Sequence, residues 1–156
     1  MRNVLIFLFY FSVASVSAQE TFYPRRIDSE KWLKQLKEIT NKDERIDYIT
    51  AKIYADTIYK NLANQIFMDN KIRDPEKHIC RTIIVVKFAN QYFKIDLVEN
   101  PKLENIVKLF NSKRIDEITF LSEVESVANF GSDGLCGVVI LNTKDKKFAR
   151  KLRNVL

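Results

Sequence analysis

All three glycines of this 156-residue chain, Gly131, Gly134 and Gly137, lie within seven residues of one another, directly before an apolar run. Glycine lets the backbone take a positive φ or approach another backbone closely. The cluster therefore predicts a cramped reversal that leads into a buried strand, "GVVILNT". A phosphate-binding loop is not expected, because no strand is predicted directly before the cluster, no helix after it, and no lysine–hydroxyl pair follows.

The N-terminal segment, "MRNVLIFLFYFSVASVSAQE", is apolar and nearly free of charge. Arg2 is followed by an uncharged run through Phe11, and small residues close the segment up to Ala18. This pattern is typical of a secretory signal peptide. A membrane-spanning helix needs about 20 apolar residues, which this segment lacks. We therefore expect residues 1–18 to be a signal peptide cleaved near Ala18, with an uncleaved anchor as the alternative.

The composition, with 46% apolar and 29% charged residues, is ordinary for a globular protein. Loss of Arg2 with the signal leaves 25 basic against 20 acidic side chains, a net charge of +5. Because the basic residues are spread along an exported chain, we expect no nucleic-acid partner.

The first half of the chain carries helical periodicity. Apolar residues recur at three- and four-residue steps in "DSEKWLKQLKEI", where Asp28 or Ser29 is placed to cap a helix. Residues 41–70 form the longest periodic segment and predict one long helix capped by Asn41. Its aromatic side chains are expected to serve packing rather than a ligand groove. The predicted apolar stripe comprises Ile46, Ile49, Ile53, Ile58, Leu62 and Ile66.

The second half alternates between strand and helix patterns. Strands are predicted in "RTIIVVKFA", "NQYFKIDLV", "RIDEITFLS" and "GVVILNT". Helices are predicted in "NPKLENIVKLFNS", "EVESVANF" and the C-terminal tail. We therefore predict an α+β fold in which N-terminal helices pack on a small mixed sheet with β-β-α-β-α-β order. The expected divisions are residues 1–18, a helical segment at 19–75 and an α+β domain at 76–156.

Cys80 and Cys136 each begin an apolar run. If the two runs pair side by side and in parallel, the cysteines become close neighbours. A disulfide requires a Cα separation of about 4.4–6.8 Å, and an oxidising compartment favours the bond. Two readings stay open: a Cys80–Cys136 disulfide, and two separate buried thiols.

The segment "SVANFGSDGLCGVVILNTK" resembles the end of the plug domain of TonB-dependent outer-membrane receptors. The order of the elements upstream agrees as well, so that the similarity runs from about Thr82 to Lys147. The resemblance implies a plug-like fold for residues 76–156. The match rests on an aromatic–glycine pair, a turn glycine, a glycine that opens the strand and a Thr-Lys ending: Phe130, Gly131, Gly134, Gly137, Thr143 and Lys144.

The sequence departs from the family pattern in three ways. Cys136 precedes Gly137 where the family usually has asparagine, and "KFANQYF" replaces the Asp-Gly turn after the first strand. The sequence also ends at Leu156, without the many strands of about 10 residues that a receptor barrel needs. We therefore expect a plug-like fold without a transport pore.

Catalytic and metal-binding patterns are not evident. His78, the only histidine, lies near Cys80, but a metal site normally gathers three or four ligands, so we expect no metal and no other cofactor. A nucleophile–base pair of Cys136 and His78 is not favoured, because Cys136 opens an apolar strand.

The tail "KDKKFARKLRNVL" is basic and amphipathic. Peripheral contact with an anionic membrane, or with an acidic partner, is one interpretation. We favour a final helix that packs on the sheet and leaves its basic face in solvent, because the apolar face is narrow for membrane binding.

These observations favour an exported, non-catalytic binding or assembly module in the periplasm or on the periplasmic face of the outer membrane. The expected partner is an envelope protein, for which the resemblance suggests an outer-membrane receptor or a TonB-linked system. Exposed sheet edges and the aromatic helical face are the predicted contacts. The alternatives are an exported enzyme or enzyme inhibitor, with a site between the helical half and the sheet, and a structural partner of a membrane complex.

Overall fold

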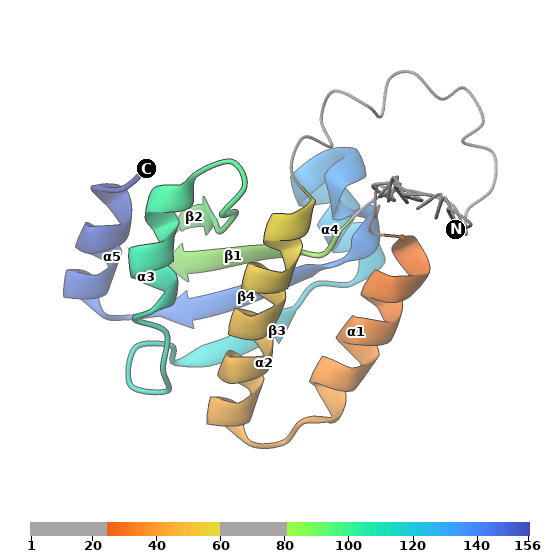
Figure 1. Ribbon diagram of the computed structural model, residues 1–156, viewed down its shortest axis with the longest axis horizontal. Helices are drawn as coiled ribbons and strands as arrows, with labels where there is room; N and C mark the ends of the chain where they lie inside the picture. Colours follow the sequence, from red (N-terminus) through yellow and green to blue (C-terminus); the bar gives the residue numbers. More distant parts are fainter. Residues whose placement is uncertain (1–24, 60–80) are drawn as a thin grey trace, which may run out of the picture.

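The computed structural model describes residues 25–59 and 81–156 (Figure 1). The α+β class is confirmed, since helices and one four-stranded mixed sheet make up the described chain. The helices within these two ranges are all too short or too polar to span a bilayer. Several predicted features lie outside the described residues: the signal peptide at residues 1–18, Leu62, Ile66, His78 and Cys80.

The first helix, α1 (Arg26–Glu38), begins earlier than predicted. It takes both Asp28 and Ser29 into its first turn, so the prediction that one of them caps the helix is wrong. Asp28 instead pairs with Arg25, at 2.9 Å between Oδ2 and Nε. The residues that α1 buries on the sheet side include Trp32 and Leu36, as the spacing predicted.

The second helix, α2 (Lys42–Ala55), is capped as predicted: Asn41 Oδ1 accepts hydrogen bonds from two backbone amides, at 2.8 and 3.2 Å. The prediction of one long helix over residues 41–70 is wrong, because α2 ends at Ala55 and a 3-10 turn, η1 (Asp56–Ile58), follows. The hydroxyl of Thr57 donates to the carbonyl of Tyr54 at 2.7 Å, which helps to close the helix locally. Ile58, predicted to be in the apolar stripe, is 66% exposed.

Four strands form the sheet: β1 (Ile83–Phe88), β2 (Gln91–Lys94), β3 (Glu117–Phe120) and β4 (Val138–Thr143). Their order across the sheet is β2-β1-β4-β3, which differs from their order along the chain because the last strand inserts beside the first. β1 and β4 pair in parallel, with Ile83 opposite Val138. Each edge strand pairs antiparallel with its neighbour, β2 with β1 and β3 with β4. The two central strands, β1 and β4, are formed by the continuous apolar runs. Such runs are typical of strands whose two faces are both covered by other parts of the protein.

Short helical elements connect the strands. They are η5 (Pro101–Leu103), α3 (Glu104–Val107), α4 (Glu123–Phe130), η6 (Gly131–Cys136) and, after the last strand, α5 (Lys146–Arg153). α4 starts with a capping box, in which the Ser122 hydroxyl accepts from the amide of Glu125 and the Glu125 carboxylate accepts from the amide of Ser122.

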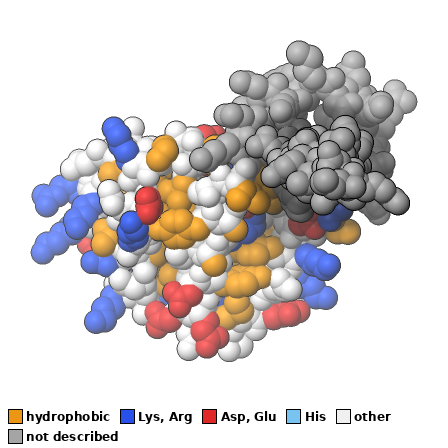
Figure 2. Space-filling view, viewed as in Figure 1, with side chains coloured by type: hydrophobic (Ala, Val, Ile, Leu, Met, Phe, Trp, Pro, Cys, Tyr) orange, Lys and Arg blue, Asp and Glu red, His pale blue; other side chains and the backbone are white. Residues whose placement is uncertain are grey.

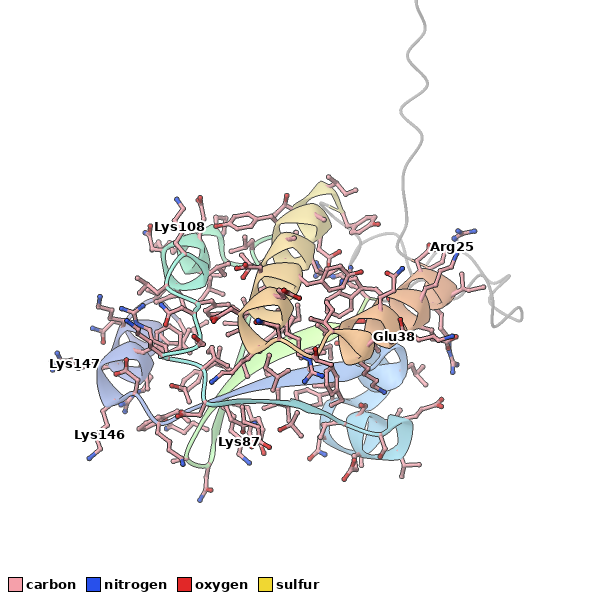
Figure 3. All side chains as sticks on the ribbon, turned by 90° about the horizontal axis from the view of Figure 1, so that it is seen from below. Arg25, Glu38, Lys87, Lys108, Lys146 and Lys147 are labelled. Carbon is pink, nitrogen blue, oxygen red and sulfur yellow. The ribbon has the colours of Figure 1, made fainter. Side chains whose placement is uncertain are left out.

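The main core lies between one face of the sheet and the helices α1, α2, α3 and α5. Figures 1 and 3 show α1 to α3 on this side and α4 on the other. Residues from the predicted helical segment and from the predicted α+β domain share this one core. The sheet contributes alternate residues of its central strands: Ile84, Val86, Val139 and Leu141.

Candidate functional site

The three glycines meet different backbone requirements. Gly131 ends α4 with φ +63°, and Gly137 ends η6 with φ +84°, a range that residues with side chains rarely adopt. Gly134 serves a close approach instead: a Cβ at this position would lie 2.2 Å from the carbonyl oxygen of Ser126 in α4. The glycines together fold η6 back against α4 and direct the chain into β4.

The motif residues singled out from the sequence lie at opposite ends of β4 and form no common site: Phe130 and the glycines precede the strand, whereas Thr143 and Lys144 lie at its end. The buried hydroxyl of Thr143 donates to the carbonyl of Arg114 at 2.6 Å and accepts from the amide of Asp145 at 3.1 Å. Lys144 is exposed, and its amide donates to the Asp116 carboxylate at 2.6 Å. These contacts tie the end of β4 to the loop before β3, which is a structural role.

Cys136 is buried beside the beginning of β1. The hydroxyl of Thr82 donates to the Cys136 carbonyl at 3.0 Å, and the amide of Ile83 donates to the carbonyl of Gly137 at 3.0 Å. The parallel pairing of β1 and β4 thus brings the chain at residue 82 next to Cys136. The described residues include no free cysteine. Because Cys80 lies outside them, the Cys80–Cys136 disulfide stays a prediction.

The aromatic side chains of α2 pack inside the fold. Tyr48 stacks on Trp32 of α1, with ring centroids 5.6 Å apart and an interplanar angle of 6°. The Tyr48 hydroxyl donates to Gln35 at 2.7 Å, and Tyr54 is partly buried against the main core. Tyr48 thus links α1 to α2, and the packing role predicted for the aromatic side chains accounts for both Tyr48 and Tyr54.

The second face of the sheet, turned away from α1 to α3, carries a smaller apolar cluster. It consists of buried alternate residues of the central strands: Ile83, Val85, Val138 and Ile140. Among the described residues, Leu121 and Phe130 pack against this cluster. Figure 3 shows α4 on this side of the sheet. The cluster and α4 form the apolar half of the second face.

The same face becomes polar toward the other end of the strands. Lys87 of β1 lies opposite Tyr92 of β2, and its ammonium group is 5.3 Å from the centre of the tyrosine ring. The side-chain amide nitrogen of Asn142 in β4 donates a hydrogen bond to the hydroxyl of Thr119 in β3 at 2.8 Å. Figure 3 shows Lys87 on this side of the sheet. These polar side chains can face water, so this half of the face needs no covering helix.

A pocket of about 190 Å³ lies where the apolar and polar halves meet. Its lining comes from β2, α4, β4 and the residue after β3: Tyr92, Leu121, Asn129, Phe130 and Ile140. Tyr92 is 50% exposed at the rim. The side-chain nitrogen of Asn129 donates to the carbonyl of Glu125 at 2.7 Å, which orients this amide at the rim. The pocket is thus an uncharged depression whose lining combines apolar side chains with one hydroxyl and one amide.

An exposed apolar stripe on α4 leads to the pocket. Val124 and Val127 are 78% and 37% exposed. Val124 and Val127 lie three residues apart, as do Val127 and Phe130, so the members of each pair are neighbours on the surface of the helix. The stripe extends the apolar surface of the pocket outward.

Sequence analysis found one of the pocket residues, Phe130, as part of the glycine motif. Asn129 and Ile140 lie in the same glycine-containing segment but were not singled out, and Tyr92 and Leu121 lie in other segments that no local pattern links to it. One signal was present: the continuous apolar run of β4 indicates a strand that is covered on both faces.

A second notable group lies where η1 approaches the start of β1. Asp56 and Asp96 are both buried; the first pairs with Lys52 and the second with Arg81. Burial raises the pKa of Asp56 above its ordinary value, an effect that outweighs the lowering by Lys52 and Arg81, and the charge of Asp96 raises it further. The two ion pairs therefore lie within electrostatic reach of each other.

We expect Asp56→Asn to change how stability depends on pH. Because the pKa of Asp56 is raised in the folded state, the folded protein binds more protons than the unfolded protein between about pH 3.9 and the folded-state pKa of Asp56. The free energy of unfolding of the wild type therefore falls as pH rises through this window. The variant lacks this titration, so its stability relative to the wild type should increase across the window. Urea unfolding between about pH 3.5 and 8 measures the difference.

Asp47→Asn removes one carboxylate at an exposed position of α2 and is the matched control for the loss of a charge. The raised pKa of Asp56 would be contradicted if the stability difference between Asp56→Asn and the wild type varied no more with pH than the difference for Asp47→Asn.

Within residues 25–59 and 81–156, no group of three or more His, Cys, Asp and Glu side chains is placed to hold a metal ion. In comparisons with known proteins, the chain matches no family model, no curated protein and no solved structure. Its function is therefore argued from the geometry and chemistry of the surfaces described above.

Proposed function

We propose that this protein is an exported, non-catalytic binding module of the cell envelope, a plug-like domain without a receptor barrel. It binds a partner protein by accepting one of the partner's apolar side chains in the pocket on the second sheet face. The plug-like motif suggests that it acts in the periplasm or at the periplasmic face of the outer membrane. The same resemblance suggests a receptor or another component of a TonB-linked system as the partner.

The observation that carries this proposal is the size of the pocket together with its lining. Sites for small molecules and cofactors commonly measure about 300–1,000 Å³. This pocket, at about 190 Å³, is smaller, and its described lining residues carry no charge. A single large apolar side chain suits such a depression better than a cofactor or a polar substrate. Anchors of this kind supply much of the binding energy at protein interfaces.

The surroundings of the pocket have the make-up of a protein interface. The exposed Val124 and Val127 supply apolar contact area next to it. At the rim, Asn129 uses its side-chain nitrogen in a bond to its own helix, and its Oδ1 accepts no hydrogen bond from the described residues. Together with the hydroxyl of Tyr92, this oxygen provides polar contacts around an apolar centre, which is the usual arrangement of an interface.

The second candidate function is an exported enzyme or enzyme inhibitor. One observation favours it: Asp56, a buried carboxyl with a raised pKa, lies between the helical half and the sheet. A raised pKa suits a carboxyl for general acid catalysis. The cluster also has a structural explanation, since Lys52 pairs with Asp56 and Arg81 with Asp96 in the manner of a buried ion-pair network. The pocket therefore supports binding more strongly than this cluster supports catalysis.

Site-specific photo-crosslinking tests the binding proposal. A photo-reactive amino acid at Val127, next to the pocket, should form an adduct with a distinct envelope protein in the cells that make this protein. The same amino acid at Lys34, exposed on α1, should not form that adduct. Mass spectrometry of the adduct identifies the partner and the crosslinked segment, which should contain an exposed apolar residue.

A matched pair of substitutions then tests the pocket. Asn129→Arg places a long cation at the rim and should abolish the Val127 adduct, whereas Ala128→Arg, exposed at the neighbouring position of α4, should leave it intact. The pocket is not the binding site if the adduct survives Asn129→Arg. If position 127 gives no adduct in these cells, the binding function itself is wrong.

A further inference from the structure

Every exposed side chain of α5 is a cation. The helix has eight residues, of which Phe148, Ala149 and Leu152 are buried in the main core. The remaining five are exposed and basic: Lys146, Lys147, Arg150, Lys151 and Arg153. We call these five side chains the α5 basic face. Figure 2 shows basic side chains gathered on the side of the molecule where α5 lies.

Ion pairs do not neutralise the α5 basic face within the described structure, although Asp145 lies near enough to attract Lys147. None of its five side chains forms an ion pair with another described residue. The nearest acidic residue along the chain, Asp145, is already engaged. Its carboxylate caps the helix by accepting from the amides of Lys147 and Phe148 at 2.8 and 3.0 Å, and it also lies 3.9 Å from Arg114. The positive charge is therefore left to attract an anionic partner.

Stabilisation of α5 through its helix dipole does not account for all five of these cations. Basic residues in the last turn of a helix stabilise its negative end, which explains Arg150, Lys151 and Arg153. Lys146 and Lys147 occupy the first turn, where the helix dipole disfavours a positive charge. The presence of two lysines at this end thus reduces the stability of the helix, which favours a role in binding.

From this arrangement we propose that the α5 basic face docks on the surface of an anionic phospholipid membrane. The exposed side chains of α5 include no aromatic or aliphatic residue, and lysine is the commonest residue among them. Protein interfaces are depleted in lysine and enriched in aromatic residues, whereas clusters of lysine and arginine are what anionic lipid headgroups attract. The apolar side of α5 is fixed in the core, so the contact is electrostatic and does not insert into the bilayer.

Vesicle sedimentation tests this contact with the protein as its cells process it. The protein should sediment with vesicles of phosphatidylcholine and phosphatidylglycerol at low salt, but not with phosphatidylcholine alone. Binding should weaken as salt is added, because screening reduces the attraction between exposed charges. The double variant Lys146→Glu/Lys147→Glu should bind the anionic vesicles at least about tenfold more weakly. This double variant should fold, because acidic side chains in the first turn of a helix interact favourably with the positive end of the helix dipole.

The control variant is Lys31→Glu/Lys34→Glu, which makes the same change in net charge on the exposed side of α1. It should retain most of the binding. Equal loss in both variants would show that net charge alone drives adsorption and would overturn the proposal. Equal binding to neutral vesicles, or binding to soluble polyglutamate without binding to anionic vesicles, would also overturn it. The latter result would assign the basic face to an acidic protein instead.

Discussion

Gly134→Ala should lower the free energy of unfolding by about 3 kcal/mol, the cost typical of forcing extra atoms into a tightly packed place. A Cβ at this position would lie 2.2 Å from the carbonyl oxygen and 2.5 Å from the carbonyl carbon of Ser126. Both are backbone atoms, which cannot move aside as a side chain can, so α4 and η6 would have to separate. Urea or thermal unfolding of the variant measures the loss. The Val127 adduct should weaken as well, because α4 carries the wall of the pocket.

Gly131→Ala is the matched control three residues earlier in the chain. No heavy atom lies within 4 Å of a Cβ built there, so the expected cost comes only from its φ of +63°. With its ψ of −147°, Gly131 has a backbone conformation that essentially only glycine adopts, and the strain with another residue is about 1–3 kcal/mol. Because Gly134 does not have a positive φ, a loss below about 1 kcal/mol in Gly134→Ala would show that the close approach of η6 to α4 does not require glycine at position 134.

Phe148→Ala should produce a loss of similar or greater size, about 3–5 kcal/mol in the free energy of unfolding. Phe148 is 1% exposed and is the largest buried side chain of α5. Its ring meets that of Phe110 edge to face, with centroids 6.0 Å apart. Truncation would leave a cavity under α5 and remove its main attachment to the core. Denaturant unfolding measures the effect.

Phe148→Leu keeps most of the apolar volume and should cost clearly less, about 1–2 kcal/mol. Phe148→Ala also leaves every charge of the α5 basic face in place while loosening the helix. If binding to anionic vesicles needs a fixed array of cations, this variant should weaken it without any change in net charge. A loss of stability below about 1 kcal/mol would show that α5 contributes little to the core.

Much of the secondary structure could be predicted from local patterns. The β-branched runs at the positions of β1 and β4 predicted buried strands, and Asn41 predicted the start of α2, because these signals act over a few neighbouring residues. The end of α2 was missed. The apolar period continues beyond Ala55, yet α2 passes into the 3-10 turn η1, where the hydroxyl of Thr57 satisfies the carbonyl of Tyr54.

The candidate site was less accessible to prediction. Phe130 was singled out for its place in a glycine motif, and the structure puts it in the wall of a pocket. Tyr92 and Leu121 belong to segments on either side of the central strands and reach the same pocket only after the sheet has formed. The strand order brings them there, and it depends on contacts between distant segments.

By itself, the sequence determined where the backbone must turn tightly, which runs must be buried, and that the last helix presents cations on its uncovered side. Glycine positions, apolar spacing and charge are properties of neighbouring residues, so they can be read without knowledge of the fold. The tertiary structure alone decided that β4 lies between β1 and β3, that α4 covers half of the second sheet face, and that a pocket forms at its edge. These features follow from which distant segments pack together, and packing over such separations leaves no local signal in the chain.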